Sequence, residues 1–176
     1  MLREVGVELK DCSFNNSAAN VGETYLNISI RKFNAAVRIG LDTVTFIAAH
    51  PYWAMTPQLV PVFDQLSDKI RRVVGSSPKF QEATIAFHIT PGPVDFREIT
   101  ASFVNKEIAG DCLFHGISLH RTDGVLIIDK SLIHEGAAFI RLQRRFPGDT
   151  AFAEIAKRLY DDQVGALRLL GISEVP

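Results

Sequence analysis

Five histidines are the side chains of this chain best suited to proton transfer or metal binding: His50, His88, His115, His120 and His134. Imidazole titrates near neutral pH and is a common metal ligand. His115 and His120 are an odd number of residues apart, so a regular strand points them to opposite faces. His134-Glu135 lacks the second histidine of the zinc-protease helix motif. The spacing therefore predicts no metal site.

His88 and His115 are the two histidines that the patterns place best. His88 shares the more polar face of an alternating segment with Glu82 and Thr84, where it faces a cleft or solvent. His115 is in register with the apolar Ile117, which favours a core or interface histidine over a catalytic one. Both residues are candidates for lining a ligand or partner site.

Acid–base catalysis by His88 or His120 together with Asp129 is the enzymatic hypothesis, and it ranks last. The chain has no glycine-rich phosphate loop, nucleophile elbow or dinucleotide fingerprint. Because no reactive motif is present, an enzyme is less favoured than a binding protein, and no cofactor is expected.

Tyr52 and Trp53 lie in a connecting segment that also contains Met55, and Trp53 is the only tryptophan. Tyrosine and tryptophan combine a large apolar area with a polar tip and are enriched at interaction hot spots. Closure of one end of the core by Trp53 is the simpler explanation. A partner or ligand surface is the alternative.

Arg141, Arg144 and Arg145 form the densest basic run. On a strand, Arg141 and Arg145 share a face and could bind an anionic group or an acidic partner. The favoured interpretation is a solvated sheet edge, because charged side chains on edge strands discourage unwanted pairing.

Two long amphipathic patterns predict helices, one over 56–74 and one over about 149–170. Pro61 indicates an irregular entry to the first, because proline has no N–H and its ring clashes with the preceding turn. Asp149 or Thr150 is the expected cap of the second. Each predicted helix ends in apolar residues followed by glycine, a common helix terminator.

Alternating apolar residues predict strands before each helix. The first two, at 4–10 and 26–30, are separated by a polar loop over 15–23. A third pattern, 37–49, changes phase at Asp42-Thr43, which favours one long strand with a bulge over a turn. Further strands are predicted at 83–89, 112–120, 125–130 and 138–146, with Asp123-Gly124 as a hairpin turn.

These elements predict an α+β fold with a mostly antiparallel sheet covered by two long amphipathic helices. We expect one compact domain over 1–176. It could comprise two similar halves, 1–78 and 79–176, related by an internal β-β-β-α duplication.

Composition excludes several classes of protein. The 176 residues include 19 basic and 20 acidic side chains, a formal charge of −1, so the broad attraction that nonspecific nucleic-acid binding requires is missing. No apolar stretch is long enough for a membrane span, and no signal-peptide core follows Met1, which favours the cytoplasm. Cys12 and Cys112 are expected to be free thiols.

The leading functional hypothesis is a non-catalytic cytoplasmic protein-interaction or assembly protein that forms a homodimer. It rests on the wide apolar arc of the 149–170 helix, which exceeds what one sheet requires, and on the Tyr52-Trp53 segment. The alternative is a small-molecule-binding protein with a cavity between sheet and helix, lined by Trp53, His88 and His115.

Overall fold

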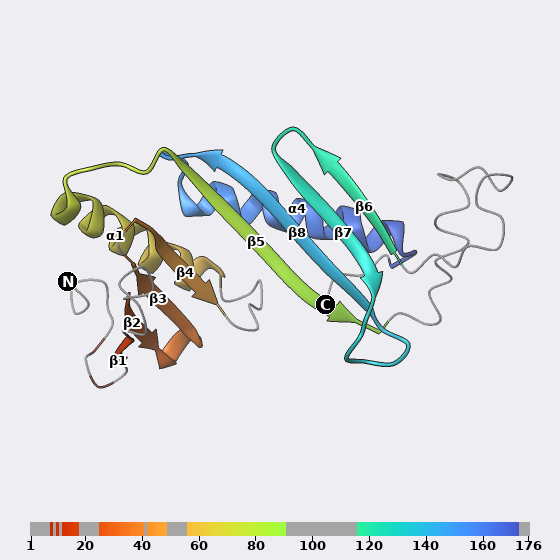
Figure 1. Ribbon diagram of the computed structural model, residues 1–176, viewed down its shortest axis with the longest axis horizontal. Helices are drawn as coiled ribbons and strands as arrows, with labels where there is room; N and C mark the ends of the chain where they lie inside the picture. Colours follow the sequence, from red (N-terminus) through yellow and green to blue (C-terminus); the bar gives the residue numbers. More distant parts are fainter. Residues whose placement is uncertain are drawn as a thin grey trace, which may run out of the picture. The chain divides into compact units, whose positions relative to one another are not determined.

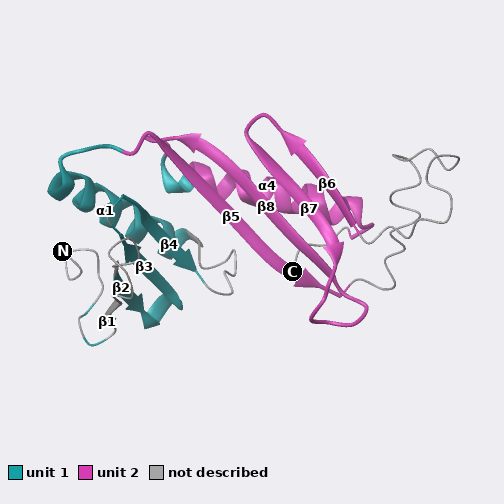
Figure 2. Cartoon of the chain, viewed as in Figure 1, with its two compact units in different colours: residues 1–77, 151–153 teal, residues 78–150, 154–176 magenta. Residues whose placement is uncertain are grey.

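The computed structural model describes residues 8, 10, 12–17, 25–40, 42–48, 56–90 and 116–172. They form two antiparallel four-stranded sheets and two α-helices, so the predicted α+β class is confirmed. The chain divides into two compact units (Figure 2). Unit 1 comprises Met1–Ser77 with Ala151–Ala153, and unit 2 comprises Pro78–Thr150 with Glu154–Pro176.

The sheet of unit 1 is an antiparallel meander in the order β1-β2-β3-β4. Its strands are β1 (Cys12–Ser17), β2 (Tyr25–Ile30), β3 (Ala35–Ile39) and β4 (Val44–Ala48). A single 3-10 turn, η4 (Arg31–Phe33), links β2 to β3 and ends at Asn34, whose φ of 47° is left-handed. Asparagine tolerates that conformation better than most residues.

The predicted loop over 15–23 is wrong at its start, because Asn15, Asn16 and Ser17 belong to β1. They pair with β2, with Asn15 opposite Asn27 and Ser17 opposite Tyr25. Backbone pairing with a neighbouring strand decides this segment, and that interaction does not depend on apolar side chains. The strand predicted over 4–10 lies outside the described residues except for Glu8 and Lys10.

The phase change at Asp42-Thr43 is a turn between two strands, and the bulge predicted there is wrong. The Gly40 N–H donates to the carbonyl oxygen of Thr43 at 2.9 Å. Strands β3 and β4 then pair in opposite directions, with Val37 opposite Phe46. Opposite residues of an antiparallel pair share a face, so the reversal keeps both apolar sets on one side of the sheet.

Helix α1 (Thr56–Val74) supplies the other half of the core of unit 1. Its buried residues recur at three-and-four spacing and pack against the sheet, and they are Leu59, Val62, Phe63, Leu66 and Ile70. The irregular entry predicted at Pro61 is wrong, because the helix is continuous from Thr56 through Pro61. Pro61 is exposed, so water can reach the backbone carbonyl of the preceding turn, to which proline has no N–H to donate. Gly75, at φ 71°, ends the helix as predicted.

The sheet of unit 2 has the order β5-β8-β7-β6 (Figure 1). Its strands are β5 (Phe80–Ile89), β6 (Gly116–Arg121), β7 (Gly124–Lys130) and β8 (Ala138–Pro147). The predicted hairpin at Asp123-Gly124 is confirmed, with Arg121 paired to Gly124. A Cβ on Gly124 would lie 2.1 Å from the carbonyl oxygen of Gln143, so only glycine fits there.

Helix α4 (Phe152–Leu169) covers one face of that sheet and lies behind it in Figure 1. The side chains between sheet and helix are at most 3% exposed: Leu126, Ile128, Ile140, Leu142, Ala166 and Leu167. The period-two burial on β7 and β8 follows from their pleat, which turns alternate residues toward the helix.

The two helices do not share one sheet, because the described strands form two separate sheets. In both units the described residues form four strands followed by a helix. Their pairing differs, since β1 pairs with the next strand in the chain whereas β5 pairs with the last strand of its unit, β8. The structure therefore does not confirm an internal duplication.

Candidate functional site

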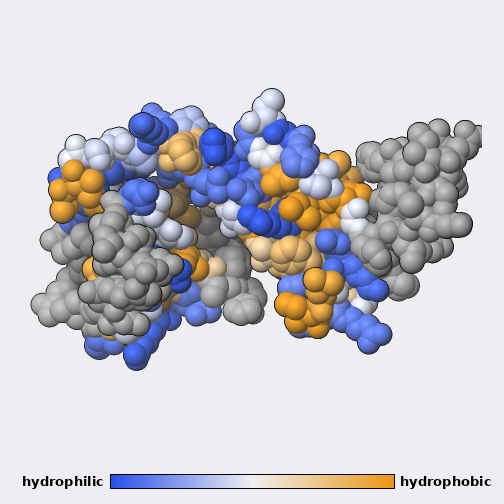
Figure 3. Space-filling view, viewed as in Figure 1, coloured by the Kyte–Doolittle hydropathy of each residue, from blue (hydrophilic) through white to orange (hydrophobic). Residues whose placement is uncertain are grey.

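The face of the unit 2 sheet opposite α4 carries three of the predicted site residues. In the strand register, His88 lies opposite Phe139 and Arg141 lies two residues further along β8, so both point away from the helix. Arg145 follows on the same face. We call this surface the open face. Figure 3 shows apolar surface in its centre, where β7 contributes the half-buried Val125 and Ile127, with hydrophilic side chains around it.

The remaining three predicted site residues, Tyr52, Trp53 and His115, lie outside the described residues. Their assignment to a partner or ligand surface stays a prediction.

Arg141 and Arg145 share a face, as expected, but β8 lies between β5 and β7 and is not a sheet edge. The solvated-edge interpretation of the arginine run is therefore wrong. Arg141 donates from Nη2 to Oε1 of Gln143 at 2.8 Å. The Arg145 guanidinium lies 4.5 Å from the centroid of the Phe80 ring and 3.9 Å from a Glu82 oxygen. Both arginines thus have partners on the open face.

His88 lies at the end of β5 in a small cluster of ring and hydroxyl groups. Its Nδ1 is 3.0 Å from Oγ of Ser131. Its ring centroid is 4.9 Å from that of His134 and 5.1 Å from that of Phe139. Ser131 already accepts two backbone N–H groups, so its own hydrogen is available for donation to His88. His88 therefore supports the loop that follows β7.

That loop, the β7–β8 loop (Ser131–Ala137), is held by hydrogen bonds along its length. The Ser131 N–H donates to the Ala137 carbonyl at 2.9 Å, and the Ala137 N–H to the His134 carbonyl at 3.2 Å. Inside the loop, the N–H groups of Ile133 and His134 donate to Oγ of Ser131 at 3.2 and 2.9 Å. Ser131 itself is only 6% exposed. The backbone of the loop is thus fixed from within.

The same loop presents two large aliphatic side chains to solvent. Leu132 is 100% exposed and Ile133 is 76% exposed. Figure 3 shows apolar surface at this loop, next to hydrophilic side chains. The sequence contained this signal, an apolar pair inside the connection between two strands, but its exposure could not be recognised without the fold.

The proposed acid–base pairs do not form on the sheet. His120 is opposite Val125, whereas Asp129 is opposite Gly116, four residues further along β6. At the rise of an extended strand, that offset is about 13 Å. His88 and Asp129 are two strands apart, with Phe139 between them. Among the described residues, no three metal-ligating side chains gather at one place.

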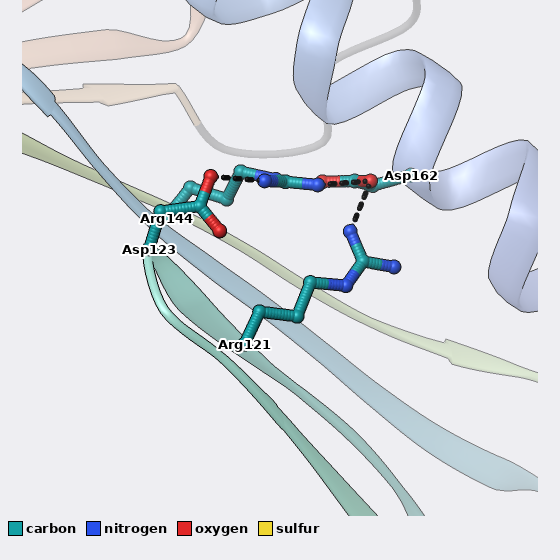
Figure 4. A network of polar contacts seen from close by, with 4 residues as sticks. All are labelled: Arg121, Asp123, Arg144 and Asp162. Atoms are coloured by element: carbon teal, nitrogen blue, oxygen red, sulfur yellow. Dashed lines mark hydrogen bonds and ion pairs between the residues drawn. The ribbon is translucent and has the colours of Figure 1, made fainter.

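The strongest electrostatic feature of unit 2 lies on the other face, between β8 and α4 (Figure 4). Arg144, with 5% of its side chain exposed, donates from Nε and Nη2 to the two carboxylate oxygens of Asp162. It also donates to Asp123 in the β6–β7 turn. Arg121 donates to Oδ1 of Asp162 at 2.9 Å. The four residues form one polar network that joins strand, turn and helix.

This network shifts two pKa values in opposite directions. Hydrogen bonding to Asp162 raises the pKa of Arg144 despite burial, so the guanidinium stays charged. Burial alone would raise the pKa of Asp162, but hydrogen bonds from Arg144 and Arg121, together with their charges, hold it below its ordinary value. Both partners are ionised in their buried setting.

The network was not predicted from the sequence, although a signal was present. Arg144 is two residues after the buried Leu142 and four after the buried Ile140 on β8, so its side chain lies on the same apolar face of the strand. Asp162 is three residues after the buried Leu159, on the apolar stripe of α4. Opposite charges on the apolar faces of two neighbouring elements predict a buried ion pair, because an unpaired charge there would be costly.

The apolar stripe of α4 contains residues of both compact units. Phe152 belongs to unit 1, where its ring centroid lies 4.9 Å from that of Phe46 and 5.7 Å from that of Phe63. Ala166 and Leu167 belong to the core of unit 2. Tyr160 and Leu169, which widen the stripe, are 38% and 41% exposed, and their use as a partner surface stays a prediction. Neither described helix has the length and apolar character needed to cross a bilayer.

Comparison with protein-family models, curated proteins and solved structures gives no significant match for this chain. Its function is therefore argued from its own residues.

Proposed function

We propose that this chain is a non-catalytic cytoplasmic protein-interaction protein and that the Leu132-Ile133 pair of the β7–β8 loop enters an apolar pocket of a protein partner. The observation that carries the proposal is the exposure of these two side chains, 100% and 76%, on a backbone held by internal hydrogen bonds.

Two physical effects support an interaction role for the loop. Burial of a leucine and an isoleucine stabilises a complex by about 1.5–3 kcal/mol per side chain. A loop whose backbone is already ordered loses little further entropy when it binds. Ser131 and Gly136, at φ 71°, fix the loop in the conformation that presents the pair. We therefore expect the loop to bind its partner without a change of backbone conformation.

A ligand cavity between sheet and helix is less well supported. The space between β7, β8 and α4 is filled by apolar side chains that are 0–3% exposed and by the Arg144–Asp162 pair. An enzymatic role has weaker support still, because the acid–base pairs considered are separated by the strand register.

A photo-crosslinking amino acid at position 132 tests the proposal. Placed at Leu132 and expressed in the source cells, it should form covalent adducts with a limited set of proteins. The matched control is the same amino acid at Lys157, an exposed position of α4. The substitution Ile133→Ser in the Leu132-labelled chain should reduce the adducts, because it removes half of the apolar surface. Equal labelling from positions 132 and 157 would contradict the proposal.

A further inference from the structure

We infer that the outer edge of β5 pairs with β5 of a second copy of this chain, in antiparallel orientation with Ile85 opposite Ile85. The pairing joins two unit 2 sheets into one sheet of eight strands. It uses a surface other than the β7–β8 loop, so it can succeed or fail independently of the function proposed above.

Strand β5 is a long edge strand without the features that normally prevent pairing. Among the described strands it pairs on one side only, with β8, and the register is continuous over all ten residues. Edge strands usually carry proline, lysine or a bulge that blocks a further strand. From Phe80 to Ile89 there is no proline, lysine or arginine, and Glu82 is the only acidic residue. The opposite edge, β6, has six residues and ends in Arg121.

The alternation of β5 restricts how two copies can pair. Odd-numbered residues such as Ile85 and Phe87 pack toward the core under α4, whereas even-numbered ones such as Thr84 and Ala86 are exposed on the open face. Opposite residues of an antiparallel pair share a face. To keep both apolar faces on one side of the joined sheet, an odd-numbered residue must lie opposite an odd-numbered one and an even-numbered residue opposite an even-numbered one. The numbers of any two opposite residues then add up to an even sum. Any other register would put the two apolar faces on opposite sides.

Among these registers, we favour the one in which Ile85 lies opposite Ile85, so that the numbers of opposite residues add up to 170. In this register the facing side chains of the two strands complement one another. It places Glu82 opposite His88 of the second copy, twice by symmetry. Because His88 Nδ1 accepts from Ser131, its Nε2–H is the donor that the facing Glu82 carboxylate can accept from. On the core side it places Ala83 opposite Phe87, a small residue against a large one. It also pairs nine residues, 81–89, of each strand. Hydrogen bonding, size and length therefore favour the same register.

Disulfide trapping tests both the partner and the register. In a background with Cys12→Ser and Cys112→Ser, chains carrying Thr84→Cys and chains carrying Ala86→Cys are mixed and mildly oxidised. Residues 84 and 86 of different copies are direct opposites, so their Cα atoms lie within the 4.4–6.8 Å that a disulfide spans. Each chain alone should link far more slowly, because residues offset by two lie about 7–8 Å apart.

Two other cysteine positions report on alternative registers. A mixture of Thr84→Cys and Glu82→Cys chains tests the register that places residue 84 opposite residue 82, with a sum of 166. A mixture of Thr84→Cys and His88→Cys chains tests the register that places residue 84 opposite residue 88, with a sum of 172. We expect the 84–86 pair to link at least about tenfold faster than either, because only that pair meets the disulfide distance. Equal rates for all three mixtures would overturn the register. A disulfide to any residue outside β5 would show that another segment occupies this edge and would overturn the inference.

A charge exchange provides a test without cysteine. The variant Thr84→Lys/Ala86→Lys places like charges opposite each other twice, and Thr84→Glu/Ala86→Lys places opposite charges there. In the first variant, repulsion in the two symmetry-related pairs should raise the dimer Kd about 2- to 30-fold. In the second variant, attraction in the same two pairs should return the Kd to the wild-type value or below it. Native mass spectrometry reads the dimer as twice the 19.5 kDa chain. A wild-type protein that is monomeric at high micromolar concentration would overturn the inference, whether or not the loop binds a partner.

Discussion

The guanidinium of Arg144 on β8 donates two hydrogen bonds to the carboxylate of Asp162 on α4, and both side chains are at most 10% exposed. The two residues are 18 positions apart, and the connection between them includes the end of β8 and the start of the helix. Because apolar contacts tolerate sliding and a two-pronged ion pair does not, the pair fixes the position of α4 along the strand.

Removal of one partner should therefore cost more than removal of both. Asp162→Asn leaves a buried guanidinium without its main countercharge, and we expect a loss of about 3–5 kcal/mol in the free energy of unfolding. Arg144→Met/Asp162→Leu replaces the pair with apolar groups and should be close to neutral or stabilising. Urea unfolding of the three proteins measures the difference. A double variant as unstable as Asp162→Asn would mean that the pair itself supplies the stability.

The same pair predicts how stability depends on pH. The pKa of Asp162 is lower in the folded protein than in the unfolded chain. Its contribution is therefore fully present above about pH 4, the ordinary range of an aspartate, and is lost as the pH falls through the lower folded-state value. Between pH 5 and pH 2 the wild type should lose more stability than Arg144→Met/Asp162→Leu. Parallel curves for the two proteins would argue against this linkage.

Phe152 should contribute to stability from the first turn of α4. Its ring contacts Phe46 and Phe63 edge-on within the core of unit 1. Phe152→Ala should cost about 3 kcal/mol, the lower end of the range for phenylalanine, because the ring is only half-buried. Lys157→Ala, an exposed change on the same helix, should stay within about 0.5 kcal/mol. A loss below about 1 kcal/mol for Phe152→Ala would show that the ring cluster is energetically minor.

Ser131 should determine the order of the β7–β8 loop. Ser131→Ala removes the acceptor of the Ile133 and His134 N–H groups and the partner of His88. We expect hydrogen exchange at those two amides to accelerate markedly, with a stability loss of about 1–3 kcal/mol. Ser118→Ala, which removes an exposed hydroxyl on β6, is the control and should leave exchange in the loop unchanged. Unchanged protection in Ser131→Ala would mean that the loop is held by other contacts.

Periodicity predicted the regular elements well, and local patterns predicted the connections poorly. The spacing of Leu59, Phe63, Leu66 and Ile70 defines α1 because three-and-four spacing has no other simple meaning. The turn at Gly40 to Thr43 was missed because a phase change alone does not distinguish a bulge from a reversal. The exposure of Leu132 was not predictable, since an aliphatic residue is normally assigned to a core.

The start of α4 shows the same limit, and it yields the last prediction. We expected Asp149 or Thr150 to cap this helix, but it begins at Phe152, whose N–H donates to Oδ1 of Asp64 on α1 at 3.0 Å. The residue before it, Ala151, has no acceptor in its side chain. A side chain 88 positions away in the sequence therefore performs the capping role, and no local pattern could reveal it.

Asp64→Ala should leave the first N–H of α4 without its acceptor and cost about 0.5–2 kcal/mol, the usual range for a lost helix cap. Asp68→Ala, one turn further along α1, is the matched control. Asp68 is 62% exposed and lies 4.0 Å from Arg71, so its loss should change stability by at most about 1 kcal/mol. Urea unfolding gives both values, and amide exchange at Phe152 should rise only in Asp64→Ala. Equal exchange at Phe152 in the two variants would show that Asp64 does not cap the helix.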